Sequence, residues 1–457
     1  MARFRKPQSL LGRATGFFVF LLEKLMPDPF VFAVILTFVG VFLALWLAPN
    51  ATLPSVASAW YGGIFAIFAF AFQMVLMLVA GYALAIAPPV QKSLAKIAAL
   101  VSTPLAAISL TVVISMIASW INWGLGLVTA GLLAREMAKR VRLDFGWLVA
   151  GAYTGFVIST EGLSGSIALS QATHGSALNI VEKVTGHGLS LNQTVFTRFN
   201  LFPCVALLIV LPIIFRSLQP TERNTMVADP ERLRQEDRRI HTKEREDTFA
   251  SALDNSWILN ICFVVFGIFA LITEWRRTSF SLDLNSVIVM LVLGGLLLHL
   301  RPSAYIEAVK QAARISGSLI LQYPLYGGLM GIITTTGLAG VLSKVFIRFS
   351  TAHTLPFFTY LTSMIITLFV PSGGGHWAVQ GPFAVPAAQQ LHASIAGTTM
   401  AVAMGESVAN MLQPFWALPI LAIAGIKMSR MLGFMVITFA VSAIVFGLAL
   451  LFLLPTP

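Results

Sequence analysis

The sequence predicts an all-α polytopic membrane protein, built as an inverted repeat of two halves with about nine transmembrane helices and two re-entrant hairpins. Three observations lead to this fold class. The 457 residues are 57% hydrophobic and 11% charged, with a mean hydropathy of +0.83, whereas soluble domains are about 25% charged. Apolar runs of about 20 residues, enough to cross a bilayer, recur along the chain. Two apolar segments are interrupted by glycine and stand about 250 residues apart, as expected of a repeat.

The N-terminal segment, residues 1–29, is basic and amphipathic, which is typical of a helix that lies in the membrane interface. The first apolar run, 30–47, is bounded by Pro29 and Pro49. It is longer than the core of a usual signal peptide, so we expect it to stay in the membrane as a span.

The first half is expected to contain these elements in order: spans 30–47 and 63–87, a hairpin at 104–139, a broken helix at 146–171 and a span at 194–215, within 30–215. Basic residues flank the hairpin on both sides, with Lys92 and Lys96 before it and Arg140 and Arg142 after it. Both ends therefore belong at the cytoplasmic face, as a re-entrant hairpin requires. Two ordinary spans are the alternative.

The rest of the chain is expected to contain a charged cytoplasmic linker at 216–255, a connecting helix at 256–273, and a second half at 284–457. The elements expected in that half are spans 284–300, 315–335 and 431–453, a hairpin at 354–391 and a broken helix at 397–424. Each half has the order span, span, hairpin, broken helix, span. The first half starts inside and the second outside, which is the inverted-topology repeat of many secondary transporters.

Basic residues also set the orientation, because lysine and arginine are retained on the cytoplasmic side. This topology puts the N-terminus in the cytoplasm and the C-terminus in the periplasm. Of the 30 Lys and Arg residues, those left outside are Lys183, Arg198, Arg276, Arg277, Lys344 and Arg348. The formal net charge of +11 follows from this retention, so we expect the lipid bilayer and no nucleic acid as a partner.

The tip of the second hairpin carries the stretch VPSGGGHWAVQGP, residues 370–382. Glycine lets backbone amides approach a ligand, and the start of a helix favours an anion. We therefore expect the tip to bind a carboxylate through Ser372, Gly373, Gly374 and Gly375. His376 is expected to assist when it is protonated, and Trp377 to form part of the apolar wall. A tight turn whose glycines serve packing is the alternative.

The tip of the first hairpin offers Asn122, Trp123 and Gly124 in the stretch SWINWGLG. By symmetry these residues are expected to face the same substrate. The pattern is short, so a simple helix break is the alternative.

The broken helices carry the remaining polar groups. Glu406, Asn410 and Gln413 share one helical face, and Pro414 frees a backbone carbonyl. An acid inside the membrane is costly and by default functional, so Glu406 is the expected proton carrier or cation ligand, and Asn410 and Gln413 are expected to bind the substrate. A structural hydrogen bond to another helix is the alternative.

The other broken helix carries Ser159, Thr160 and Glu161. Together with Glu406 these residues could hold the coupling ion, H⁺ or Na⁺, or Glu161 could lie toward the outer water. There is no metal-ligand spacing, phosphate loop or nucleophilic triad, so the sequence predicts no metal and no cofactor.

These residues lie in a chain that resembles the short-chain fatty acid uptake transporter family of the AtoE type. The resemblance is carried by LMPDPFVFAVILTF (25–38), INWGLGLVTAGLLAREMAKRV (121–141), VPSGGGHWAVQGPFAVPAAQ (370–389) and NMLQPFWALPILAIAG (410–425). It implies import of small monocarboxylates such as acetoacetate and butyrate across a bacterial inner membrane. By analogy with the ion-transporter superfamily it also implies a homodimer with an elevator motion. The chain departs from the family at 158–162, where a glycine-rich run is expected.

The sequence thus predicts a secondary transporter, a symporter of short-chain monocarboxylates, and no enzyme. Phe383, Phe415 and Trp416 are expected to wall the apolar tail of the acid. A cation/proton antiporter is the first alternative, motivated by Glu406 and Glu161. An intramembrane enzyme using Ser372, His376 and Glu406 is the second, but nothing in the sequence orients a nucleophile beside a base.

Overall fold

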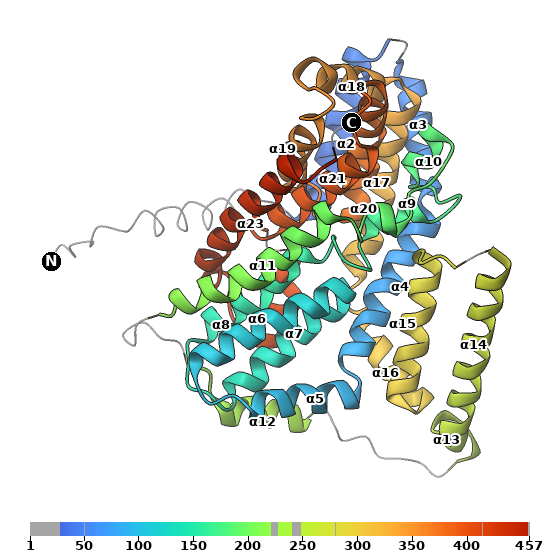
Figure 1. The fold of residues 1–457 in the computed structure, drawn as a ribbon. Coiled ribbons are helices and arrows are strands. Elements are labelled where there is room, and N and C mark those ends of the chain that lie inside the picture. The colour runs from blue at the N-terminus through green and yellow to red at the C-terminus, as the bar shows by residue number, and fades with distance from the viewer. Residues whose placement is uncertain are drawn as a thin grey trace.

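The computed structural model describes residues 28–49, 51–220, 227–239, 248–278, 280–413 and 415–455, and every regular element in them is a helix (Figure 1). The predicted interfacial segment 1–29 lies almost wholly outside the described residues, and so does Pro414. Figure 1 shows α5, α12 and α13 at one end of the molecule and α3, α10 and α18 at the opposite end.

The chain begins with the helices α2 (Pro29–Leu47), α3 (Leu53–Ala66), α4 (Phe68–Ala85) and α5 (Pro88–Ala99). Proline stands in the first turn of α2, α3 and α5, where its missing N–H costs no hydrogen bond. The span expected over 63–87 is interrupted at Ile67, whose backbone is not helical. It therefore consists of the end of α3 and the whole of α4.

The next helices are α6 (Pro104–Ile121), α7 (Trp123–Ala138), α8 (Phe145–Thr154), the 3-10 turn Gly155–Ile158, α9 (Ser166–Ala172), α10 (Ile180–Thr185) and α11 (Arg198–Ser217). One extended residue, Asn122, separates α6 from α7, and its side chain accepts a hydrogen bond from the Leu125 amide at 2.7 Å. This is an N-cap, so the break is encoded locally. The helices α6 and α7 pack against each other along the predicted hairpin.

The region between the halves contains α12 (Pro230–Arg239), α13 (Phe249–Asp254) and α14 (Trp257–Thr278). The helix α14 includes the predicted connecting helix and packs chiefly on α15, at the edge of the molecule in Figure 1.

The last helices are α15 (Leu284–His299), α16 (Pro302–Ala313), α17 (Gly317–Thr335), α18 (Leu338–Phe349), α19 (Leu355–Thr367), α20 (Gly373–Gln390), α21 (Ile395–Asn410), α22 (Ala417–Ala424) and α23 (Leu432–Phe452). Six helices of the second half each begin about 250 residues after a counterpart in the first half. The pairs are α4 and α17, α5 and α18, α6 and α19, α7 and α20, α8 and α21, and α9 and α22.

The hydropathy of the sequence did not predict α3, α5, α16 and α18. The helices α5 and α18 are amphipathic, and α5 carries Lys92 and Lys96 while α18 carries Lys344 and Arg348. Charged side chains keep such a helix below the hydropathy of a span, so a search for apolar runs overlooks it.

Six described helices are long and apolar enough to cross a membrane: 30–47, 68–85, 104–121, 198–217, 257–277 and 432–452. The pair α17 and α18 passes the same test together but is bent by 76°. The chain is therefore a helical protein with several candidate spans. The number of nine transmembrane helices stays a prediction. So does the re-entrant nature of the hairpins, because of the four helices in the two hairpins only α6 is among these six candidate spans.

The helices form two packed groups. The first, which we call the scaffold group, contains α2, α3, α4, α15, α16 and α17. The second, the core group, contains α6 to α9, α11 and α19 to α23. The two groups meet chiefly where α7 packs on α4 and α20 packs on α17, so the starts of α7 and α20 lie at the boundary.

Candidate functional site

A small buried cavity lies where the two hairpin tips and the two broken helices meet. Its volume is about 30 Å³, which leaves room for little more than a water molecule. The lining residues are Met74, Trp123, Phe156, Ser159, Thr160, Ser166, Tyr323, Gly373, Glu406 and Trp416. They come from both groups of helices and from both halves of the chain.

The break after the 3-10 turn places Ser159 and Thr160 at this cavity, and Glu161 directly behind it. The Thr160 hydroxyl donates to Glu161 Oε1 at 3.0 Å and lies equally close to the Ala403 carbonyl. The Ser407 hydroxyl donates to Glu161 Oε2 at 2.9 Å and also contacts the Thr160 hydroxyl. Both carboxylate oxygens of Glu161 thus have partners, and the side chain is fully buried rather than facing outer water.

Glu406 is buried and lines the cavity from α21. Its Oε1 accepts a hydrogen bond from Asn410 Nδ2 at 3.3 Å, while its Oε2 has no hydrogen-bond partner among the described residues. The same holds for Asn410 Oδ1, although the Asn410 backbone carbonyl accepts from the Tyr153 hydroxyl at 2.8 Å. A buried acceptor without a donor costs free energy, so Glu406 Oε2 is an oxygen at this cavity that a ligand, ion or proton would stabilise.

The tip of α20 reaches the cavity through Gly373, and the preceding Ser372 bonds a lining residue. The Ser372 hydroxyl donates to the Tyr323 hydroxyl at 3.0 Å, which ties this tip to α17. A Cβ on Gly373 would lie 2.8 Å from Glu406 Oε2 and would also collide with Ser166 Oγ. Glycine is therefore required there for the tip to approach the acid.

The two following glycines face the scaffold group instead. A Cβ on Gly374 would collide with the Phe70 ring, and one on Gly375 with the Tyr326 ring. Close packing of α20 against α4 and α17 thus accounts for both glycines, as the packing alternative foresaw. Binding of a carboxylate by the amides of the tip stays a prediction.

Three other predicted site residues lie outside the cavity lining. The His376 ring lies 2.9 Å from Thr367 Oγ1 and 2.6 Å from Gln380 Oε1. Trp377 Nε1 donates to the Leu178 carbonyl at 3.0 Å, and Gln413 Nε2 donates to the Thr367 carbonyl. These side chains tie elements of the core group together.

At the first tip, Trp123 lines the cavity while Asn122 and Gly124 face α4. The Trp123 amide donates to Ser164 Oγ at 2.9 Å, and its ring meets the Trp416 ring edge to face at 5.2 Å. A Cβ on Gly124 would lie 3.0 Å from the Leu78 carbonyl, and one on Gly81 would collide with the Asn122 amide. Glycine therefore allows close packing at this tip as well.

Sequence reasoning missed several lining residues: Met74, Phe156, Ser166 and Tyr323 as parts of the cavity, and Trp416 as a donor. Trp416 Nε1 and Ser159 Oγ are buried without a hydrogen-bond partner among the described residues. One signal was available, because Tyr323 is a polar group inside an apolar run. The orientation of the Trp416 N–H depends on tertiary packing and has no sequence signature.

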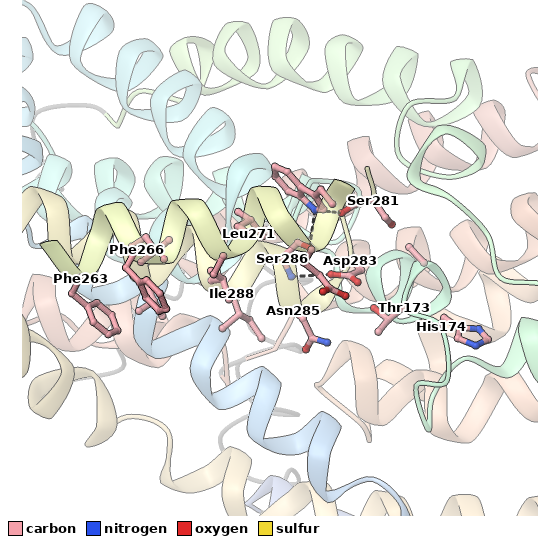
Figure 2. A pocket seen from close by; sticks show the side chains of 18 residues that line it. Thr173, His174, Phe263, Phe266, Leu271, Ser281, Asp283, Asn285, Ser286 and Ile288 are labelled. Carbon is pink, nitrogen blue, oxygen red and sulfur yellow. Dashed lines mark hydrogen bonds between the residues drawn. The ribbon is translucent and has the colours of Figure 1, made fainter. Parts of the chain in front are cut away.

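A larger crevice, of about 860 Å³, lies between α14 and α15. Figure 2 shows Phe263 and Phe266 along its apolar part and Asp283 near its polar end. Glu274 also lines it. The crevice lies chiefly between two helices at the edge of the molecule, whereas both hairpin tips, both broken helices and several unpaired polar atoms of the described residues meet at the smaller cavity, so we place the candidate site there.

Fold and cavity together define a class: helical membrane proteins whose buried site lies between interrupted helices, as in secondary transporters. The family model described as "Short chain fatty acid transporter" matches residues 10–453. The chain belongs to the short-chain fatty acid transporter family, as its motifs predicted. Because this is a family of transporters, the intramembrane-enzyme alternative is set aside.

Two relatives match along almost their whole length, and each is named "Putative short-chain fatty acid transporter". The protein from Escherichia coli K12 is 37% identical over 442 residues, which is 96% of this chain and 99% of the relative. The protein from Haemophilus influenzae is 34% identical over 448 residues, covering 97% and 100%.

Two solved structures share the fold. The YdaH transporter of Alcanivorax borkumensis matches with a TM-score of 0.58 at 15% identity, over 93% of this chain and 98% of that one. MtrF of Neisseria gonorrhoeae, described with a class of antimetabolite efflux pumps, matches with a TM-score of 0.55 at 15% identity, over 97% and 99%. At this identity the likeness concerns the fold alone.

Proposed function

We propose that this chain is a secondary active transporter that imports short-chain monocarboxylates, such as butyrate and acetoacetate, across the inner membrane together with a cation. The observation that carries the proposal is the cavity itself. It combines unpaired donors, an apolar wall and one buried acid.

The donors suit the head group of the acid. Ser159 Oγ and Trp416 Nε1 are both buried and unpaired in the described part of the chain, and a carboxylate would satisfy both. The three-carbon tail of butyrate would pack on Met74, Phe156 and Trp123, which supply apolar surface at the same cavity. Ser372 and the amides of the α20 tip would complete the head-group site.

The buried acid gives a physical reason for ion coupling. A substrate carboxylate beside the Glu406 carboxylate would place two negative charges in a site that excludes water, where their repulsion is strong. A proton on Glu406, or Na⁺ between the two groups, removes that cost. Glu406, Ser159 and Thr160 could ligate Na⁺, with Glu161 stabilising Thr160, so both ions fit the proposal.

Alternating access would come from movement between the two groups of helices. The cavity is too small for a four-carbon acid, as expected of a closed conformation without substrate. The tips of α7 and α20 contact α4 and α17 at glycines 81, 124, 374 and 375. Because glycine has no side chain that would block sliding, these contacts suit an elevator-like displacement. The offset of about 250 residues between counterpart helices supports an inverted repeat, and a homodimer with a cytoplasmic N-terminus and periplasmic C-terminus completes the proposal.

The test is uptake of labelled butyrate by cells that produce Ser159→Ala or Trp416→Phe. Each change removes one donor and keeps the shape, so each should lower the apparent affinity about tenfold or more. The matched control is Ser442→Ala, whose hydroxyl bonds the Thr438 carbonyl within α23 at 2.7 Å. Uptake at the unmutated level in both variants would contradict the assigned site.

A cation/proton antiporter is a second candidate, favoured by the two buried acids linked through Thr160 and Ser407. Sodium-loaded vesicles separate the two functions. An antiporter acidifies or alkalinises the lumen without any carboxylate, whereas the proposed symporter, with either ion, leaves the luminal pH unchanged when no carboxylate is present.

A further inference from the structure

A second cavity, of about 870 Å³, opens between the scaffold group and α10. Its hydroxyl-bearing and charged lining residues are Ser55, Ser58, Thr334, Thr335, Thr336 and Lys183. It lies where α3 begins and α17 ends, at the end of the molecule that also holds α10 and α18 (Figure 1).

Lys183 carries the one charge among the residues that line this cavity, all of which belong to the described part of the chain. The neighbouring Glu182 does not line the cavity: its carboxylate accepts from the Gly175 amide at 2.9 Å and pairs with His174, although its charge still acts on Lys183. The ammonium group of Lys183 donates to the Ala177 carbonyl and is the positive group at the cavity, where the surrounding hydroxyl groups are compatible with a hydrated anion.

The position of Lys183 is fixed by the core group. The Gln171 side chain donates to the Leu178 carbonyl at 2.9 Å and accepts from the Val181 amide at 3.1 Å. Trp377 of α20 donates to the same Leu178 carbonyl. One wall of the cavity thus belongs to α10, which the core group holds in place, and the other to α3 and α17.

The two cavities are both lined by residues of one face of α17. Met330 lines the outer cavity and Tyr323 lines the buried one, and residues seven apart lie on the same face of a helix. Between them, Tyr326 packs on Gly375, and Phe70 packs on Gly374 and stacks edge to face with Tyr323 at 5.8 Å. These aromatic contacts separate the two cavities.

We propose that this cavity is an anion vestibule in which Lys183 concentrates small carboxylates before they pass the aromatic contacts to the buried site. The proposal rests on the proposed transport function. It assigns Lys183 to recruitment, so the residue sets the concentration at which transport saturates and leaves the maximal rate unchanged.

The test compares saturation of labelled butyrate uptake in the unmutated protein and in Lys183→Gln. We expect the KM to rise about threefold to tenfold at low ionic strength and the difference to shrink in about 0.5 M salt, because salt screens an exposed charge. Lys183→Arg should behave as the unmutated protein. Lys344→Gln is the matched control, since Lys344 lies at the same end on α18 and does not line the cavity.

Charge rescue tests the same point on one protein sample. In Lys183→Cys, with the exposed Cys262 changed to serine and the buried Cys204 kept, a thiol reagent that adds an ammonium group should restore the KM. A reagent that adds a sulfonate should raise it further. An unchanged KM in Lys183→Gln, or equal effects of the two reagents, would overturn the vestibule. Absence of saturable butyrate uptake by the unmutated protein would instead overturn the transport function itself.

Discussion

At the scale of single residues, the two buried acids differ in what holds them. Glu161 has partners at both oxygens, whereas among the described residues Glu406 leaves one oxygen without a partner, and so do Ser159 Oγ and Trp416 Nε1 at the same cavity. Unpaired buried polar groups are expensive, and a bound ligand, ion or water would satisfy them. We therefore assign a positioning role to Glu161 and a role in ligand and ion binding to Glu406.

This division predicts that Ser407→Ala lowers stability more than it alters the cavity. The change removes a donor from the buried carboxylate of Glu161, which should cost about 1–3 kcal/mol. Thermal unfolding of the purified protein in detergent measures the loss. Ser442→Ala, whose hydroxyl bonds its own helix, should lose less than half as much, and equal losses would contradict the role given to Glu161.

At the scale of helices, the interruptions were predictable and the close contacts were not. Glycine, asparagine and proline mark the breaks near Asn122 and Ser372, because these residues cap or end helices. The same sequence does not reveal that Gly374 and Gly375 face aromatic rings of the scaffold group. A glycine that serves packing and one that serves a ligand look alike until the opposite surface is known.

The contact between α3 and α17 gives a prediction at this scale. A Cβ on Gly63 would collide with the backbone at Gly327, whereas a Cβ on Gly62 would meet nothing within 4 Å. Gly63→Ala should therefore destabilise the protein by about 1–3 kcal/mol, while Gly62→Ala is neutral or slightly stabilising. Thermal unfolding of the two variants side by side decides the matter, and similar midpoints would argue against the observed helix contact.

At the scale of the whole molecule, the apolar composition identifies a helical membrane protein, and the two interrupted segments indicate where its halves correspond. The amphipathic helices α5, α16 and α18 escaped prediction because charged residues interrupt their apolar runs, and most of α3 escaped because its 14 residues are too few to span a bilayer. The cavity could be located only in part, since Phe156, Met74 and Tyr323 reach it from elements distant in sequence. Glu406 was found from sequence because an acid is rare in so apolar a run.

The most direct test of the whole account is cation-driven butyrate uptake by purified protein in liposomes, with imposed proton or sodium gradients. We expect the unmutated protein to accumulate butyrate only when one of these gradients is present. In Glu406→Gln the gradient should no longer drive uptake, while exchange of internal for external butyrate persists. Uptake by the unmutated protein that ignores both gradients, or a Glu406→Gln variant driven as well as the unmutated protein, would contradict the account.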